Sequence, residues 1–571
     1  MRNLELADIF NRIADILEIK GDNPFKVRAY RRVVLTLENL PEDIEKIYER
    51  EGLKNIPGIG EGIAKKIEEL LETGKLESYE EMRKTLPEGL LEMLSVPDVG
   101  PKTARLLYKK LGVGSIDQMK KAAQQGKIKA LEGMGEKTEE NILRGIELLR
   151  RRTGRMLLGT AFQLTQSIIA KLSGMNEVER ISPAGSLRRM KETVGDIDIL
   201  ITSPTPKPVM NVFTNFPEVT QILAHGDTKS SVIMENRMQV DIRVVKSESF
   251  GAALQYFTGS KQHNIRIREM AVKKGLKINE YGVFRNNKKI AGEEEEEVYS
   301  TLGLPYIPPE LREDRGEIEY AAKGELPELV ELDNIKGDLH IHSSWSDGVD
   351  TIPALVESAK KAGYSYLAVC DHSASLKIAG GLSKERRLQQ IAEIKQLNKK
   401  MTDFRILAGA EIDIKSDGTL DCEEKVLRKL DIVVAAIHTG FKQDVDVITS
   451  RLMRAMQNKF VNIIAHPTGR IIQTREPYPV EMQKLFREAK RTKTVLELNS
   501  FPDRLDLNDI NCREAKSHGI MISIATDCHN RAQMGVMKYG IGTARRGWLA
   551  KKDVINCLEL DALMKLLAKK K

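Results

Sequence analysis

The sequence predicts a multidomain protein with three differently built parts: a helical N-terminal region, an α+β centre and a C-terminal α/β region. Residues 1–150 are amphipathic helical segments broken by short Gly-rich turns, and β-rich stretches first appear after about residue 155. The last third alternates short apolar runs with helical stretches, which is typical of β-α units forming a parallel sheet or barrel. At 571 residues the chain is too long for one compact core.

The composition indicates a soluble globular protein. Hydrophobic residues make up 41% and charged residues 30%. No apolar run approaches the roughly 20 residues that span a bilayer, and the first residues contain no secretory apolar core. Five cysteines at irregular spacing argue against a disulfide framework. We therefore expect a cytoplasmic protein with no membrane partner. The net charge of +8 is compatible with a polyanionic partner but does not identify one.

The centre of the chain carries three carboxylates in strand-like runs. Asp196 and Asp198 are two residues apart, so in a strand both side chains point to the same face. Two such carboxylates repel each other unless a cation lies between them. Asp241, in the run 239–245, supplies a third oxygen ligand, and the set suits paired Mg²⁺ ions that bridge the phosphates of a nucleotide.

A Gly-led turn before the first carboxylate strand strengthens this interpretation. Ser186 and Arg189 are well placed there for β- and γ-phosphates, since a guanidinium binds phosphate oxygens bidentately. Arg243 is two residues after Asp241, so we expect it to share that face and to pair with Asp198 when metal is absent. An Asp-x-Asp pair alone is more often a chance surface feature, but the whole combination favours a catalytic site.

These motifs resemble the nucleotidyltransferase palm of the family X DNA polymerases. Residues 256–260, with Asn264 and Arg268, resemble the thumb segment that selects a deoxyribose sugar and reads the minor groove. Residues 302–313 are similar to the C-terminal thumb signature of the family. The resemblance extends from about residue 1 to 315. One departure is Lys261, where the animal enzymes carry Asp, which puts an equal nucleotide affinity in doubt.

The resemblance implies a role for each matching position. Asp196, Asp198 and Asp241 would be the catalytic ligands of Mg²⁺ or Mn²⁺, and Arg268 would contact DNA. The residues expected to bind the dNTP are Ser186, Arg189, Gly195, Tyr256, Phe257, Gly259 and Asn264. The substrate would be gapped or nicked DNA, and we expect the protein to act as a monomer, associated with the nucleoid.

Three Gly-rich turns in the helical region match helix-hairpin-helix motifs. Glycines let the backbone approach a ligand closely, and the next helix offers unpaired N–H groups to a phosphate oxygen. Any one copy is as often an ordinary turn, but three copies beside a polymerase palm favour sequence-independent binding to DNA. The expected DNA-binding residues are Gly58, Gly60, Gly62, Gly100, Lys102, Gly133 and Gly135.

A lyase activity on 5′-deoxyribose phosphate is a further hypothesis from the same resemblance. Lys66 matches the Schiff-base lysine of the family, and Lys26 and Tyr30 match supporting positions. Nearby basic groups such as Lys65 would favour the neutral, nucleophilic form of Lys66. Gly62 stands where lyase-competent relatives carry another lysine, so a surface lysine without chemistry is an equal alternative.

Six histidines and three acids occupy equivalent positions in the last third, at or near the ends of predicted strands. In β/α barrels the C-terminal strand ends converge on one mouth, so these side chains are expected to meet. Imidazole and carboxylate ligands suit Zn²⁺, Mn²⁺ or Fe²⁺. The nine candidate ligands are His340, His342, Asp347, His372, Glu411, His438, His466, Asp527 and His529. Cys370 and Cys528 point away from them as core thiols.

This constellation resembles the PHP (polymerase and histidinol phosphatase) superfamily over residues 333–571. The resemblance implies a distorted (β/α)7 barrel with up to three metals, and the filled ligand positions argue for an active domain. Its fusion to a family X core is similar to the bacterial and archaeal form of the enzyme. The expected activities are 3′–5′ exonuclease or 3′-end processing, and cleavage at abasic sites.

The expected boundaries follow these motifs. They are a lyase-like helical domain (1–80), a fingers-type helical domain (81–150), the palm (151–247), the thumb (248–315), a polar linker (316–332) and the PHP domain (333–571). The acidic run 293–297 is interpreted as a solvated loop or helix face. The expected function is gap-filling DNA synthesis in base-excision or end-joining repair. The alternatives are a DNA-tethered metal-dependent phosphatase and a scaffold with weak or untemplated nucleotide addition.

Overall fold

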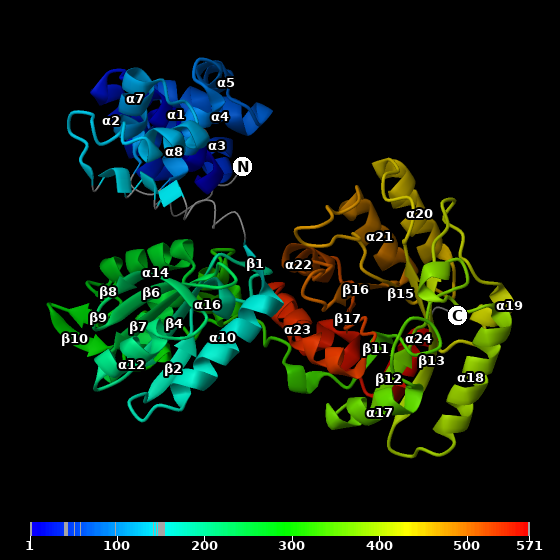
Figure 1. Ribbon diagram of the computed structural model, residues 1–571. Coiled ribbons are helices and arrows are strands. Elements are labelled where there is room, and N and C mark those ends of the chain that lie inside the picture. The colour runs from blue at the N-terminus through cyan, green and yellow to red at the C-terminus, as the bar shows by residue number, and fades with distance from the viewer. Residues whose placement is uncertain are drawn as a thin grey trace. The chain divides into compact units, whose positions relative to one another are not determined.

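The computed structural model describes residues 3–38, 44–50, 52–56, 59–96, 99–136, 138–140, 142–143, 145–146 and 155–568. The chain consists of two compact units, Met1–Gly154 and Arg155–Lys571. Figure 1 shows the first unit in blue to cyan and the second from cyan to red. Within the described ranges, no helix combines the length and the apolar character needed to cross a membrane.

The described part of the first unit is built from helices around two separate apolar cores. One core includes Phe10, Val33 and Leu70, and the other includes Leu90, Leu107 and Met119. Two cores agree with two helical subdomains. The helices are α1 (Asn3–Lys20), α2 (Pro24–Glu38), α3 (Ile44–Glu49), α4 (Glu61–Thr73), α5 (Glu77–Lys84), α6 (Glu88–Glu92), α7 (Pro101–Leu111) and α8 (Ile116–Gln124).

The second unit begins with a five-stranded mixed sheet, in the strand order β2-β4-β7-β6-β5. Residues alternate along its strands, so apolar side chains such as Ile197 and Val240 enter the core while the carboxylates stay on the other face. The strands are β2 (Arg180–Pro183), β4 (Asp196–Thr202), β5 (Val219–His225), β6 (Lys229–Met234) and β7 (Gln239–Val245), with a small pair β1 (Met156–Leu157) and β3 (Thr193–Val194). The accompanying helices are α10 (Leu158–Ser173), α11 (Gly185–Arg188) and α12 (Pro206–Thr214).

A smaller α+β region follows the sheet. Its elements are α13 (Phe250–Thr258), α14 (Lys261–Lys273), the antiparallel strands β8 (Lys277–Asn279), β9 (Gly282–Arg285) and β10 (Lys288–Ala291), α15 (Glu295–Thr301) and α16 (Glu317–Lys323). The acidic run is not simply a solvated face, because Glu295 is buried and pairs with Arg188 and Arg312. These partners are distant in sequence, so no local pattern reveals them.

The segment 316–332, expected as a polar linker, is folded into the unit. It contains α16, and Glu317 is fully buried with its carboxylate 2.7 Å from Nδ1 of His263. Arg315, just before it, forms an ion pair with Asp509 at 2.9 Å. A charged residue looks solvated in the sequence, but a partner from another element allows it to be buried.

The C-terminal region is a seven-stranded parallel sheet with consecutive strand order, as the β-α pattern predicts. A bridge between Ile341 and Cys528 links the first strand to the chain after the last and nearly closes a barrel. The strands are β11 (Gly337–Ile341), β12 (Tyr366–Val369), β13 (Arg405–Asp413), β14 (Ile432–Ala436), β15 (Ile463–Ile464), β16 (Val495–Asn499) and β17 (Ile522–Ala525). The helices are α17 (Ile352–Lys361), α18 (Lys384–Asn398), α19 (Glu424–Leu427), α20 (Val445–Gln457), α21 (Met482–Thr492), α22 (Asp509–Ser517), α23 (Met537–Arg546) and α24 (Leu560–Ala568).

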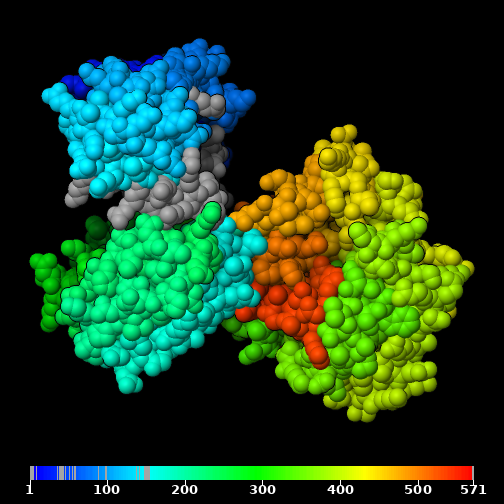
Figure 2. Space-filling model, viewed as in Figure 1, coloured from blue at the N-terminus to red at the C-terminus, as the bar shows by residue number. Residues whose placement is uncertain are grey.

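Helix α23 connects the barrel with the five-stranded sheet inside the second unit. Figure 2 shows this red segment between the cyan residues near 160 and the green-to-yellow barrel. Tyr539 on the helix packs edge-on against Phe162, at a centroid distance of 5.9 Å. Gly159 touches the barrel loop so closely that a Cβ there would lie 2.7 Å from Pro502. The sheet and the barrel therefore share a packed interface.

Candidate active sites in the sheet and in the barrel

The three central carboxylates lie together on neighbouring parallel strands. β4 and β7 pair in parallel register, with Asp198 opposite Asp241. Asp196 is the exposed first residue of β4. Gln239 donates a hydrogen bond to Asp241 at 3.0 Å. Gly185 has a φ of +62°, and a Cβ there would lie 2.4 Å from a carboxylate oxygen of Asp198. The turn before β4 therefore has room only for glycine at this contact.

The electrostatics of this group fit a bound cation. Burial, with the negative charges of Asp196 and Asp241, raises the pKa of Asp198 to about 7. A divalent cation would relieve this repulsion, and carboxylate oxygens are the ligands that Mg²⁺ and Mn²⁺ prefer. The expected ion pair between Arg243 and Asp198 does not form within the described sheet. The Arg243 guanidinium instead lies over the Phe257 ring, 4.5 Å from its centroid, because the aromatic face competes for the cation.

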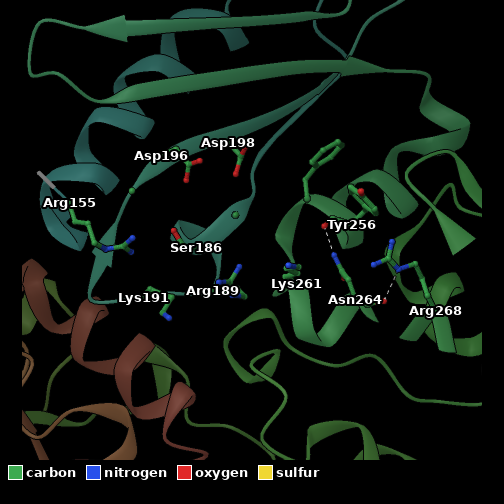
Figure 3. A pocket seen from close by; sticks show the side chains of 14 residues that line it. Arg155, Ser186, Arg189, Lys191, Asp196, Asp198, Tyr256, Lys261, Asn264 and Arg268 are labelled. Atoms are coloured by element: carbon green, nitrogen blue, oxygen red, sulfur yellow. Dashed lines mark hydrogen bonds between the residues drawn. The ribbon is translucent and has the colours of Figure 1, made fainter. Parts of the chain in front are cut away.

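A pocket of about 500 Å³ opens beside Asp196 and Asp198 (Figure 3). Its wall brings together the turn before β4 and the first residues of α14, which are far apart in sequence. Every residue expected to bind the dNTP lines this pocket, as does Arg268. The lining also contains three cations without a predicted role, Arg155, Lys191 and Lys261. Cations gathered next to carboxylates suit the polyphosphate of a metal-bound nucleotide.

Hydrogen bonds from the protein fix the thumb side of the pocket. The Asn264 side chain donates to the Tyr256 carbonyl and accepts from Gln255, both at 2.7 Å. Arg268 donates to the backbone carbonyl of Asn264 at 3.2 Å. Asn264 thus connects the end of α13 to the start of α14, so it orders this wall in addition to any contact with a nucleotide.

The sequence pattern did not reveal Arg155 and Lys191 as pocket residues. Arg155 is held by Thr193, whose hydroxyl accepts a hydrogen bond at 2.8 Å from the guanidinium. Burial lowers the pKa of Lys191, against the raising effect of Glu313. Neither position belongs to a motif. Lys191 is two residues after Arg189, which was a usable signal, whereas helix α10 and strand β2 separate Arg155 from the Gly-led turn.

The Gly-rich turns of the first unit lie directly before helices. Gly60 precedes α4 and Gly100 precedes α7, both in extended conformation, so each helix starts with unpaired N–H groups. Gly62 and Lys102 are in the first turns of these helices, and Gly133 and Gly135 precede helical residues 138–140. A side chain at Gly60, Gly62, Gly100, Gly133 or Gly135 would meet no protein atom within 4 Å, so these backbones are open to a ligand. Gly58 lies outside the described residues.

Lys66, the expected lyase residue, lies on α4. Its ammonium donates a hydrogen bond to the Ser78 hydroxyl at 2.7 Å. The expected supporting residues differ in environment: Tyr30 is buried and packs against Phe10, while Lys26 pairs with Asp22 at 3.2 Å. Tyr30 thus belongs to a hydrophobic core.

The barrel brings the predicted ligands to one place. Three groups have ligand atoms that all lie within 4.8 Å of one another: His342, Asp347, His372 and His529; His340, His342 and Asp527; and His372, Glu411 and His438. His466 completes the set, with Nε2 at 3.2 Å from Glu411. His342 belongs to two groups and Glu411 contacts several histidines, so the ligands form one continuous cluster.

The protonation pattern of this cluster supports metal binding. His340 and His342 approach each other through Nε2 atoms 3.2 Å apart, which suits two nitrogens facing a common cation. The buried Nδ1 atoms of His342 and His466 have no hydrogen-bond partner among the described residues. Burial opposes the effect, but Glu411 raises the pKa of His372 to about 10 and that of His438 to about 9. A cation in place of those protons would satisfy the same lone pairs.

Residues outside the predicted set orient these ligands. Glu497 accepts from Nδ1 of His340 at 2.8 Å, and Asp413 contacts Nδ1 of His438, so in each case Nε2 is turned toward the cluster. Neither acid was predicted as a functional residue. Asp413 is two residues after Glu411 in the same strand, a signal that could have found it, whereas Glu497 lies in an apolar strand run without a motif. Cys370 and Cys528 are buried core residues, and burial raises the pKa of the Cys370 thiol to about 12.

Carboxylates crowded beside a cationic pocket are what metal-assisted transfer of a nucleotide requires, so the sheet places the chain among the nucleotidyltransferases. The barrel adds the donor set of a metal-dependent phosphoesterase. Family models agree. They match a helix-hairpin-helix domain at residues 1–76, a SAM-like helix-hairpin-helix tandem at 90–147, a DNA polymerase beta thumb at 253–313 and a PHP domain at 338–500.

The chain belongs to the family X DNA polymerases that carry a C-terminal PHP domain. It is 42% identical over 98% of both chains to the DNA polymerase/3′-5′ exonuclease PolX of Bacillus subtilis. It is 26% identical to DNA polymerase lambda of Rattus norvegicus, over 54% of this chain and 56% of that protein. A probable phosphatase of Thermoanaerobacter sp. is 27% identical over 38% of this chain and 89% of its own length.

Proposed function

We propose that this protein is a DNA-directed DNA polymerase that fills short gaps, with a 3′–5′ exonuclease in its PHP barrel. The similarity over nearly the whole length to a protein named as both polymerase and exonuclease carries this proposal. Two separate constellations of potential metal ligands support it, one in the sheet and one in the barrel. Each activity then has its own set of side chains.

In the polymerase site, Asp196, Asp198 and Asp241 would hold Mg²⁺ or Mn²⁺. The bound metals would activate the 3′-hydroxyl and neutralise charge on the leaving pyrophosphate. Ser186 and Arg189 bind the β- and γ-phosphates, since they line the pocket beside the carboxylates. Tyr256, Phe257 and Asn264 contact the sugar and base, and the backbone at Gly195 and Gly259 gives the nucleotide room.

In the barrel, the nine ligands would hold up to three Zn²⁺, Mn²⁺ or Fe²⁺ ions. The metals would supply an activated water and bind phosphate oxygens. Glu497 and Asp413 keep the His340 and His438 rings in place, which limits the geometry in which a phosphodiester can bind. The same site is proposed to process damaged 3′ ends and to cleave at abasic sites.

The helix-hairpin-helix turns would grip the DNA backbone through the N–H groups that begin α4 and α7. Gapped or nicked DNA is the proposed substrate, dNTPs are the second, and the pathway is base-excision or end-joining repair. We propose that the protein acts as a monomer on the DNA of the nucleoid in the cytoplasm. The domain boundaries proposed from the sequence remain unchanged, with residues 316–332 as a folded connector.

One gel decides between the activities. The protein is incubated with a 5′-phosphorylated gapped duplex, dNTPs and Mn²⁺ or Mg²⁺. Primer extension up to the downstream strand is the expected result, with 3′ shortening when dNTPs are omitted. Shortening without any extension would support the alternative of a DNA-tethered phosphoesterase. The similarity over nearly the whole length to a protein named as a DNA polymerase disfavours that alternative.

A further inference from the structure

The turn that carries the phosphate-binding arginine is held by the barrel. Arg546, at the end of α23, donates to the backbone carbonyl of Arg189 at 2.8 Å. The same guanidinium pairs with Glu313 and with Asp509, each at 2.9 Å. Arg546 is 4% exposed, so these three contacts account for its burial.

Glu313 links Arg546 to the Arg189 side chain, because its carboxylate contacts both guanidinium groups. Its carboxylate accepts from Nε of Arg189 at 2.9 Å, while Nη1 of Arg189 donates to the Thr258 carbonyl. Within the described residues, Nη2 of Arg189 has no protein partner, so it remains available on the wall of the pocket. Burial opposes ionisation, but Arg546 and Arg189 hold the pKa of Glu313 at about 2. The carboxylate therefore stays charged between its two guanidinium partners.

The barrel also shapes the residues that follow Arg189. Met190 has a φ of +54°, a conformation that a non-glycine residue keeps only when its surroundings demand it. A Cβ at Gly542 of α23 would lie 2.4 Å from the Met190 side chain, so the helix packs directly on this turn. Arg470, on a barrel loop, pairs with Glu192 at 2.7 Å. Barrel residues thus contact both ends of the turn that presents Lys191 to the pocket (Figure 3).

We infer that Arg546 is a positioning residue for the nucleotide pocket, and that the PHP domain is therefore part of the support of the polymerase site. Arg546 does not line the pocket and acts through Glu313 and the backbone of Arg189. The inference rests on the proposed polymerase function. It implies that the barrel contributes to dNTP binding even when its own metal site is inactive.

The test measures KM and kcat for dNTP incorporation on a gapped primer with the full-length protein. In Arg546→Ala the KM for dNTP is expected to rise about tenfold with kcat changed less than about threefold, because binding of the triphosphate is lost equally in the ground and transition states. Arg546→Lys keeps the charge but loses the planar guanidinium, so its KM for dNTP should lie between those of the wild type and Arg546→Ala. Exonuclease activity should equal that of the wild type.

Arg545→Ala is the matched control. Arg545 is the neighbouring residue on α23 and pairs with Glu310 at 2.8 Å, but it has no contact with Arg189 among the described residues. Its KM for dNTP should stay within about twofold of the wild type. Asp509 pairs with Arg546 outside the pocket, so Asp509→Asn should also raise the KM for dNTP. This variant decides the matter if Arg546→Ala fails to fold.

The outcomes separate this inference from the proposed function. No dNTP incorporation by the wild type would overturn the polymerase function itself. Incorporation by the wild type with an unchanged KM in folded Arg546 and Asp509 variants would overturn the positioning role alone. A parallel loss of kcat, exonuclease activity and melting temperature would also overturn it, because Arg546 would then only stabilise the fold.

Discussion

Asp198 and Asp241 face each other in the parallel register of β4 and β7. The two side chains come from strands that are distant in sequence, and Asp198 also shares its strand face with Asp196. Burial, together with the negative charges of Asp196 and Asp241, raises the Asp198 pKa to about 7. The repulsion among these carboxylates is unfavourable without a divalent metal, and a bound metal would relieve it.

Removal of Asp241 should separate catalysis from DNA binding. Asp241→Ala is expected to lower primer extension by more than about 100-fold. Loss of a residue that only orients a metal ligand costs up to about 100-fold, and Asp241 would itself be a ligand. DNA affinity should remain near wild type, and it should weaken steeply with salt because backbone contacts release counterions. Gel extension and a salt series of binding titrations check this, with the exposed Asp227→Ala as control. Near wild-type extension by Asp241→Ala would exclude the two-metal assignment.

The two catalytic sites should be separable by point substitutions. His342 belongs to two ligand groups of the barrel, so His342→Ala should remove 3′-end degradation and abasic-site cleavage while extension continues. Asp196→Ala should do the reverse. His518→Ala, in the barrel but outside the cluster, serves as control. If His342→Ala kept its nuclease in metal-controlled buffer and Asp196→Ala lost it, the nuclease would have to be assigned to the polymerase core.

The nuclease should lose activity in acid before the polymerase does. Glu411 raises the pKa of His372 and His438, so the metal-free cluster holds protons that a metal must displace. Lower pH therefore favours the protonated, metal-free form. Because these pKa values are about 10 and 9, activity at a fixed, limiting metal concentration should fall progressively as the pH drops below about 9. Parallel pH profiles of 3′ shortening and extension measure this. Added metal should shift the nuclease profile to lower pH, and a profile insensitive to metal would contradict the explanation.

Glu295 should be a main stabilising residue of the second unit. Glu295→Gln leaves Arg188 and Arg312 without their buried partner and should cost about 3–5 kcal/mol, whereas the exposed Glu296→Gln should have little effect. Burial opposes ionisation, but Arg312 and Arg188 depress the pKa of Glu295 to about 2. Its contribution is therefore present above the unfolded pKa of about 4.3 and lost as pH falls toward 2. Denaturant melts from pH 7 to 3 check both effects, and equal melts of the two variants would contradict them.

Borohydride trapping tests the lyase hypothesis. If Lys66 forms a Schiff base, an incised abasic substrate should yield a covalent adduct that disappears in Lys66→Ala. Lys75→Ala, at an exposed lysine just after α4, should keep the adduct. Because Lys66 already donates to Ser78, Ser78→Ala should also change the yield. The absence of any Lys66-dependent adduct would mean that the protein has no lyase activity.

The sequence by itself determined the features that depend on local periodicity. Alternation along a strand places Asp196 and Asp198 on one face, and the repeated β-α pattern brings the ligands from His340 to His529 to one barrel mouth. Only the tertiary structure decided which charges meet across elements. Arg546 reaches Arg189 from 357 positions away, Glu295 is buried between two arginines, and Arg243 stacks on Phe257. Such pairings depend on how separate elements pack, so no periodic pattern in the sequence predicts them. The sequence therefore predicted both sites but not the support that joins them.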